Sequence, residues 1–179
     1  KEITDSKEYI ALAGKGIEIK FALEDQETVS SNRMDGTVVI ISFDPDFYKK
    51  ISQEVMVLIA RYELNQAFLK ISNPERYKST STDRRKDQGL FNIERDALYY
   101  MLGFNADELQ LLKATFKVFR AQLGDELAPD SEEMRQAENL DWLIKIVEFG
   151  IANKIEIDAN IDLADLDSGL SAIFNDQVR

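Results

Sequence analysis

The segment from Tyr62 to Gln66 has the frame of a helix that binds catalytic zinc. Such a helix presents two histidines four residues apart, so both imidazoles reach one metal. A glutamate beside the first histidine accepts a proton from the bound water. Glu63 occupies that position, but Tyr62 and Gln66 stand where the histidines belong, and the chain contains no histidine and no cysteine. Because tyrosine and glutamine are poor zinc ligands, we expect no metal, no cofactor and no catalytic residue here.

An ordinary amphipathic helix is an alternative interpretation of the same residues. In that case Glu63 lies on the helix surface, and Tyr62 and Ala67 are packing residues. Both interpretations stay open at the level of the sequence.

The residues around this segment add to the pattern. An apolar strand ending at Ser42-Phe43 precedes it, and a second helical stretch that begins with residues 90–93, Leu-Phe-Asn-Ile, follows it. In this outline residues 37–103 resemble the metallopeptidase-type domains of bacteria and phages that accompany von Willebrand A-type modules. The resemblance implies a zincin-like scaffold that has lost its catalytic function, and it is compatible with a phage origin. The implied pseudo-site consists of Tyr62, Glu63, Gln66, Asn92 and Asp96.

Charge is distributed unevenly along the chain, whose net charge is −11. Residues 121–179 contain fourteen Asp or Glu against four Lys or Arg, a net charge of −10. This third should repel nucleic acid and attract a basic protein. The alternative is that these carboxylates only maintain solubility. The candidate partner-binding residues are Asp130, Glu132, Glu133, Asp158, Asp162 and Asp165.

The expected elements are β structure followed by helices. Apolar alternation and turn residues predict strands over 9–13 and 17–23 about a glycine turn, a polar loop through Ser30 and Asn32, and a central strand over 37–43. Capping and breaking residues predict helices over 45–71, 90–102, 105–123, about 129–149 and 165–174, with a long loop over 75–89. These elements make an α+β fold, a small N-terminal β-sheet packed against a mainly helical C-terminal bundle. We expect a single domain, 1–179, with a β-rich part over 1–43 and a helical part over 44–179.

Three functions are compatible with these features. We favour a non-catalytic protein-binding domain that acts as an assembly, structural or regulatory factor in the cytoplasm, or on a virion if a phage encodes it. The first alternative is an acidic inhibitor that imitates DNA, which an ordered double row of carboxylates would favour. The second is a carboxylate-dependent hydrolase, which requires Glu63 and Asp96 to converge in a cavity. We expect no direct contact with nucleic acid or membrane, and the oligomeric state stays open.

Overall fold

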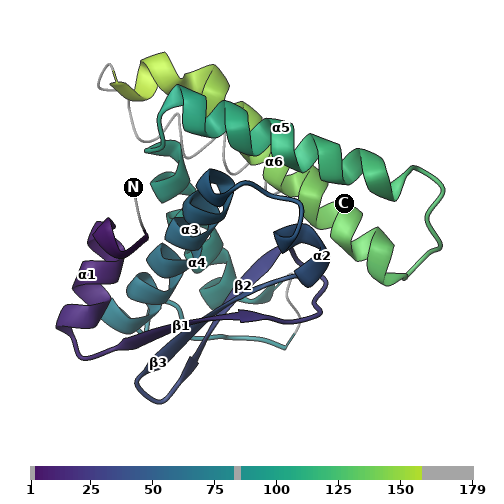
Figure 1. Cartoon of the computed structure of the whole chain (residues 1–179). Helices are drawn as coiled ribbons and strands as arrows, with labels where there is room; N and C mark the ends of the chain where they lie inside the picture. Colours follow the sequence, from purple (N-terminus) through teal and green to yellow (C-terminus); the bar gives the residue numbers. More distant parts are fainter. Residues whose placement is uncertain (1–2, 83–85, 159–179) are drawn as a thin grey trace.

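A computed structural model describes residues 3–82 and 86–158 and has the expected α+β architecture (Figure 1). A 3-10 turn over Ile3–Asp5 precedes the first helix. The strands are β1 (Glu18–Leu23), β2 (Ser30–Asp35) and β3 (Val38–Phe43). The helices are α1 (Lys7–Gly14), α2 (Pro45–Tyr48), α3 (Gln53–Ser72), α4 (Gln88–Leu102), α5 (Ala106–Leu123) and α6 (Glu132–Asp158).

The three strands form one sheet in the order β1-β3-β2. β3 pairs in parallel with β1 and antiparallel with β2, so that Ile41 lies opposite Phe21 on one side and Asn32 on the other. The prediction of a central strand is confirmed, because β3 has neighbours on both sides and buries Val39, Ile41 and Phe43.

The N-terminal part differs from the expected β-hairpin, because residues 7–14 form helix α1. The Ser6 side chain accepts a hydrogen bond from the Tyr9 N–H and so caps the helix. Leu12 is fully buried whereas Ile10 is 60% exposed, so only one side of the helix packs against the fold. The predicted strand over 9–13 is therefore wrong, since a short apolar run does not distinguish strand from helix by periodicity alone. The β-rich part over 1–43 consequently contains a helix as well.

The prediction of a polar loop through Ser30 and Asn32 is also wrong, because this segment forms the edge strand β2. Pairing with β3 holds the strand, and Gly36, at φ 60°, closes the turn between them. Polar residues are tolerated in β2 because Ser30 and Asn32 form hydrogen bonds with Glu63 on α3.

The helices follow the predicted order with shifted ends. Asp44 caps α2 as expected, but the predicted helix over 45–71 is interrupted, and Ser52 caps a new helix, α3. The predicted capping box of Asn105 and Glu108 is present at the start of α5. The last described helix, α6, continues through Gly150 to Asp158 instead of ending near residue 149. The predicted helix over 165–174 lies outside the described residues.

Helix α3 lies at the centre of the fold. It packs on β2 and β3 on one side and contacts α1, α4 and α5 on the others. The α5–α6 hairpin crosses this layer and extends past the sheet (Figure 1). Two contacts connect the hairpin to segments next to the sheet. Phe47 of α2 packs on Phe119 with ring centroids 4.4 Å apart, and Arg135 pairs at 2.7 Å with Glu27, between β1 and β2. Among the described residues, no helix is long and apolar enough to span a bilayer.

Candidate functional site

The motif segment lies in the middle of α3, and its residues Glu63 and Gln66 face β2. Tyr62 and Glu63 are buried, with 7% and 4% of their surfaces exposed, and Ala67 is buried as well. Glu63 is therefore not a helix-surface residue, whereas the packing roles expected for Tyr62 and Ala67 are confirmed.

Both carboxylate oxygens of Glu63 accept hydrogen bonds from β2. Ser30 Oγ donates to Oε1 over 2.5 Å, and Asn32 Nδ2 donates to Oε2 over 2.6 Å. The same Asn32 amide group donates to Gln66 Oε1 over 3.0 Å, and its oxygen accepts from Lys70 Nζ over 3.1 Å. The side chain of Asn32 thus connects Glu63, Gln66 and Lys70 in one network between the edge strand and α3.

Burial dominates the electrostatics of this network. Removal from water raises the pKa of Glu63, because burial penalises the ionised form. The hydrogen bonds from Ser30 and Asn32 and the positive charge of Lys70 act in the opposite direction and only partly offset that effect. Glu63 is therefore more readily protonated than a glutamate in water.

A cavity of about 230 Å³ lies beside Glu63. Its polar wall carries Ser30, Asn32, Glu63 and Gln66 from β2 and α3, and Lys70 adds a charge near them. Apolar side chains from four helices complete the lining, and they include Leu58, Ile93, Met101, Leu112, Phe116 and Leu143. The cavity is thus amphiphilic, with titratable groups on one side only.

The side chains at the motif positions do not fit a zinc ion. Gln66 Oε1 already accepts from Asn32, and Glu63 accepts two hydrogen bonds that hold it against β2. Within residues 3–82 and 86–158, no three His, Cys, Asp or Glu side chains converge in a way that could hold a metal. One carboxylate flanked by an amide and a phenol lacks the nitrogen or sulfur donors that zinc prefers.

We therefore expect the purified protein to carry no stoichiometric zinc. Elemental analysis by mass spectrometry should find far less than one transition metal per chain, and a chelator should leave the melting temperature unchanged. One tightly bound zinc per chain, with a chelator-sensitive melting temperature, would contradict the degenerate-site interpretation.

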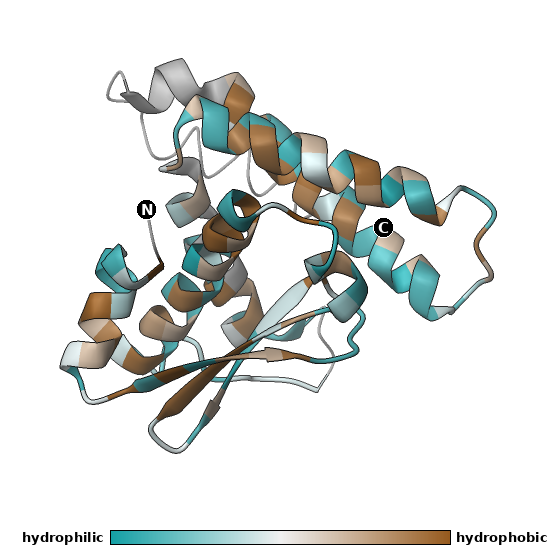
Figure 2. Ribbon diagram, in the orientation of Figure 1, coloured by the Kyte–Doolittle hydropathy of each residue, from teal (hydrophilic) through white to brown (hydrophobic). Residues whose placement is uncertain are grey.

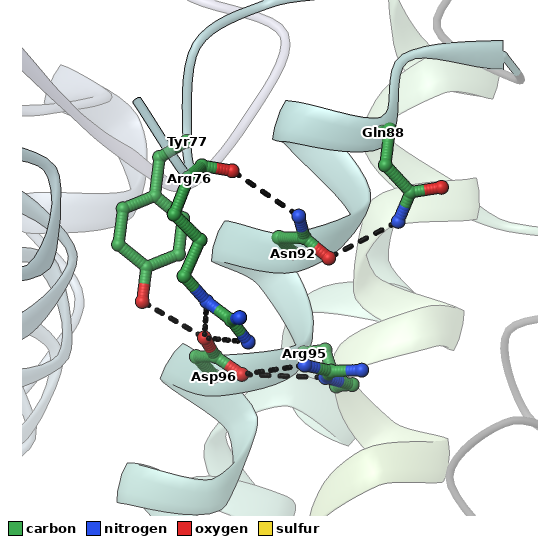
Figure 3. A network of polar contacts seen from close by, with 6 residues as sticks. All are labelled: Arg76, Tyr77, Gln88, Asn92, Arg95 and Asp96. Atoms are coloured by element: carbon green, nitrogen blue, oxygen red, sulfur yellow. Dashed lines mark hydrogen bonds and ion pairs between the residues drawn. The ribbon is translucent and has the colours of Figure 1, made fainter. Parts of the chain in front are cut away.

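Asn92 and Asp96, the other two pseudo-site residues, belong to a separate cluster on α4 (Figure 3). Arg76 Nε and the Tyr77 hydroxyl donate to Asp96 Oδ2 over 3.0 and 2.8 Å, and Asn92 Nδ2 donates to the Arg76 carbonyl oxygen over 3.1 Å. Burial opposes the ionisation of Asp96, but hydrogen bonds from Arg76 and Tyr77 and nearby positive charge outweigh it, and its pKa is lowered. Asp96 is therefore a paired anion that holds residues 76–77 against α4 through an ion pair and hydrogen bonds. It does not line the cavity beside Glu63.

The acidic candidates fall into two groups. Asp130, Glu132 and Glu133 are exposed where the α5–α6 loop meets α6. Asp158 is the last residue of α6, and Asp162 and Asp165 lie outside the described residues.

Sequence reasoning did not identify Ser30, Asn32 and Lys70 as members of the site. The separation of 33 residues between Ser30 and Glu63 hides their contact from any local pattern. The one available signal was the alternation of Ser30 and Asn32, which places both side chains on the same face if the segment is a strand.

The chain was also compared with known proteins. Comparison with protein families, with curated proteins and with solved structures found no match to this chain. The resemblance of residues 37–103 to metallopeptidase-type domains therefore stays a prediction from the sequence.

Proposed function

We propose that this protein is a non-catalytic protein-binding domain that acts as an assembly, structural or regulatory factor. Its binding surface is the acidic tip, which we define as residues 124–133 at the far end of the α5–α6 hairpin (Figure 1). The proposed location is the cytoplasm, or a virion if a phage encodes the protein. The absence of cysteine agrees with a reducing compartment.

The observation that carries this proposal is unbalanced charge at the acidic tip. Five carboxylates lie there, and no Lys or Arg occurs between Arg120 and Arg135. Their side chains are exposed. Asp125 is 99% accessible and lies 3.8 Å from Arg120, a long and exposed ion pair that contributes little. Hydrophilic residues cover the start of α6 and much of the adjoining loop (Figure 2). The five are Asp125, Glu126, Asp130, Glu132 and Glu133.

The body of the hairpin is balanced by comparison. Glu148 pairs with Lys113 and Lys117 at 3.2 and 2.8 Å, and Asp141 pairs with Arg120 at 3.0 Å. Glu148 and Asp141 are thus neutralised by α5, and negative charge is less balanced at the acidic tip. A localised field of one sign steers a partner of opposite charge toward that end.

The same pattern gives less support to a DNA-mimic inhibitor. Such a protein needs carboxylates in an extended double row, but ion pairs interrupt the acidic residues along the described helices. The acidic tip alone is too short to imitate a duplex.

A carboxylate-dependent hydrolase also has less support. Its two expected carboxylates, Glu63 and Asp96, occupy different clusters, and Arg76 pairs with Asp96. A raised pKa in a cavity is common among catalytic acids. In Glu63, however, both oxygens already accept hydrogen bonds from within the fold.

Charge reversal at the acidic tip should slow association with the partner. The variant replaces Glu126, Glu132 and Glu133 by Lys and keeps Asp130, whose φ of 61° a lysine would tolerate less well. Affinity capture from the native host with quantitative mass spectrometry identifies the partner, and stopped-flow or surface binding then gives the rates. We expect the association rate to fall about tenfold or more at 0.1 M salt, where the screening length is about 10 Å, and the difference to shrink at 1 M, where it is about 3 Å.

A matched control separates position from total charge. Lysine at the exposed positions Asp5, Asp35 and Glu75 changes the net charge by the same amount away from the acidic tip. This control should associate much faster than the tip variant. Equal rates for the two variants, or an association indifferent to salt, would show that the acidic tip is not the binding surface.

A further inference from the structure

The cavity beside Glu63 opens at its polar end. The lining residues Ser31, Gln66, Lys70 and Leu90 are only partly buried, whereas the apolar residues at the opposite end are buried. A ligand that enters between β2 and the start of α4 therefore meets the polar wall first and extends its apolar part toward α5 and α6.

Two hydrogen-bond acceptors in this cavity have unused capacity. An ionised carboxylate offers about four acceptor positions, and Glu63 receives one hydrogen bond at each oxygen from the side chains of β2. Across the cavity, Oδ1 of Asn139 on α6 is buried and accepts no hydrogen bond from the described part of the chain. A buried acceptor without a donor costs about 1–3 kcal/mol, so Asn139 Oδ1 favours a ligand that donates, and Glu63 has room to accept from the same ligand.

We propose that this cavity is a binding site for a small primary amine, an ammonium group carried on an apolar body. An ammonium supplies three N–H donors, and its positive charge adds to that of Lys70 in offsetting the burial of the carboxylate. Its apolar body would pack against Leu58, Leu112 and Phe116. The volume is sufficient, since an engineered cavity of about 150 Å³ binds benzene, and this one is about 230 Å³.

Other ligand classes fit less well. A carboxylate could pair with Lys70, but it brings a second negative charge to the wall that carries Glu63 and supplies no donor to Glu63 or to Asn139 Oδ1. A divalent cation requires several oxygen ligands, and Glu63 is the one carboxylate in the lining. Lys70 donates to Asn32 Oδ1, and Asn139 Oδ1 accepts no hydrogen bond from the described part of the chain, Lys70 included.

Benzylamine and benzyl alcohol test the proposal, because they share a ring and differ in charge. Titration of the intact protein, followed by NMR chemical shifts and calorimetry, should show saturable binding of benzylamine and at least tenfold weaker binding of benzyl alcohol. Glu63→Gln removes the charge and should weaken benzylamine at least tenfold. Asn139→Leu removes the second acceptor at nearly constant size and should weaken it several-fold.

Asn65 provides the matched control. Its Oδ1 is also buried without a hydrogen-bond partner in the described residues, but it does not line the cavity. Asn65→Leu should therefore bind benzylamine as the wild type does, and so should the charge-reversed tip variant. Because the tip variant changes the proposed partner surface but not the cavity, its binding of benzylamine tests the two proposals separately, and either proposal can be wrong while the other holds.

Three outcomes would overturn the proposal. They are no saturable binding of benzylamine at millimolar concentrations, equal affinity for the amine and the alcohol, and chemical-shift changes that map away from residues lining the cavity. If Glu63→Gln does not fold, the two ligands on the wild-type protein and the Asn139→Leu variant still decide between these outcomes.

Discussion

Alanine at position 89 should destabilise the protein by about 2–4 kcal/mol, in the upper range for overpacking. Gly89 lies in the first turn of α4, where an added Cβ would stand 2.1 Å from the carbonyl oxygen of Lys78. That oxygen belongs to the backbone, so no side-chain rotation can relieve the clash. The loop that contains Lys78 would have to move, together with its hydrogen bonds to Asp87 from Ser79 Oγ and the Thr80 N–H. Equilibrium denaturation in urea measures the change directly.

Gly14→Ala is the matched control for this substitution. Gly14 ends α1 and has no neighbouring atom within 4 Å of an added Cβ. Alanine there should be neutral or stabilise the protein by up to about 1 kcal/mol, because alanine is the better helix former. A Gly89→Ala protein as stable as the Gly14→Ala protein would contradict the close approach of α4 and the loop.

Elements with strong local signals were predictable from the sequence. The start of α2 was correctly predicted from Asp44 and the proline after it, and the start of α5 from Asn105 and Glu108. Capping depends on neighbours within three residues, so the sequence shows it directly. The apolar run that ends at Phe43 was correctly placed at the centre of the sheet, since an interior strand is buried on both faces.

Elements that depend on distant partners were not predictable. β2 contains no β-branched or aromatic residue, and its pairing with β3 overrides its weak strand propensity. Gly150 lies just past the predicted end of the helix near residue 149, yet α6 continues through it, because a single glycine costs only about 1 kcal/mol and packing against α5 outweighs that cost.

Only the local part of the candidate site was predictable from the sequence, because its other residues are distant along the chain. The frame of Tyr62, Glu63 and Gln66 is local to one helical turn and could be found in the sequence. The hydrogen bonds that determine the chemistry of Glu63 come from Ser30 and Asn32 of β2, which the chain brings beside α3 only in three dimensions. Burial of Glu63 could not be inferred, because acidic residues inside an amphipathic helix usually face solvent.

Glu63 should make the stability of the protein fall as pH rises through the weakly acidic range. Its pKa is raised in the folded state above the ordinary value of 4.5, so between those two values the folded protein holds a proton that the unfolded chain has lost. The stabilising contribution is complete below about pH 4.5 and is lost as pH rises through the folded-state pKa. The slope cannot exceed about 1.4 kcal/mol per pH unit, which is the limit for one proton.

Other carboxylates act in a different pH window. The pKa values of Asp96, Glu24 and Glu148 are lowered, and that of Asp87 is lowered to about 2. Their contributions are present above the ordinary values of 3.8 and 4.5 and are lost as pH falls through the lowered ones. The range from pH 5 to 8 therefore isolates Glu63 from these groups.

Glu63→Gln supplies the direct measurement, because glutamine cannot titrate. The difference in unfolding free energy between the wild type and this variant, measured in urea at each half pH unit from 5 to 8, should shift in favour of the variant as pH rises. Glu75→Gln, the same substitution at an exposed loop position, is the matched control. A difference that stays constant across this range would mean that the carboxyl group of Glu63 is already ionised at pH 5. Its hydrogen bonds from Ser30 and Asn32 would then compensate its burial fully.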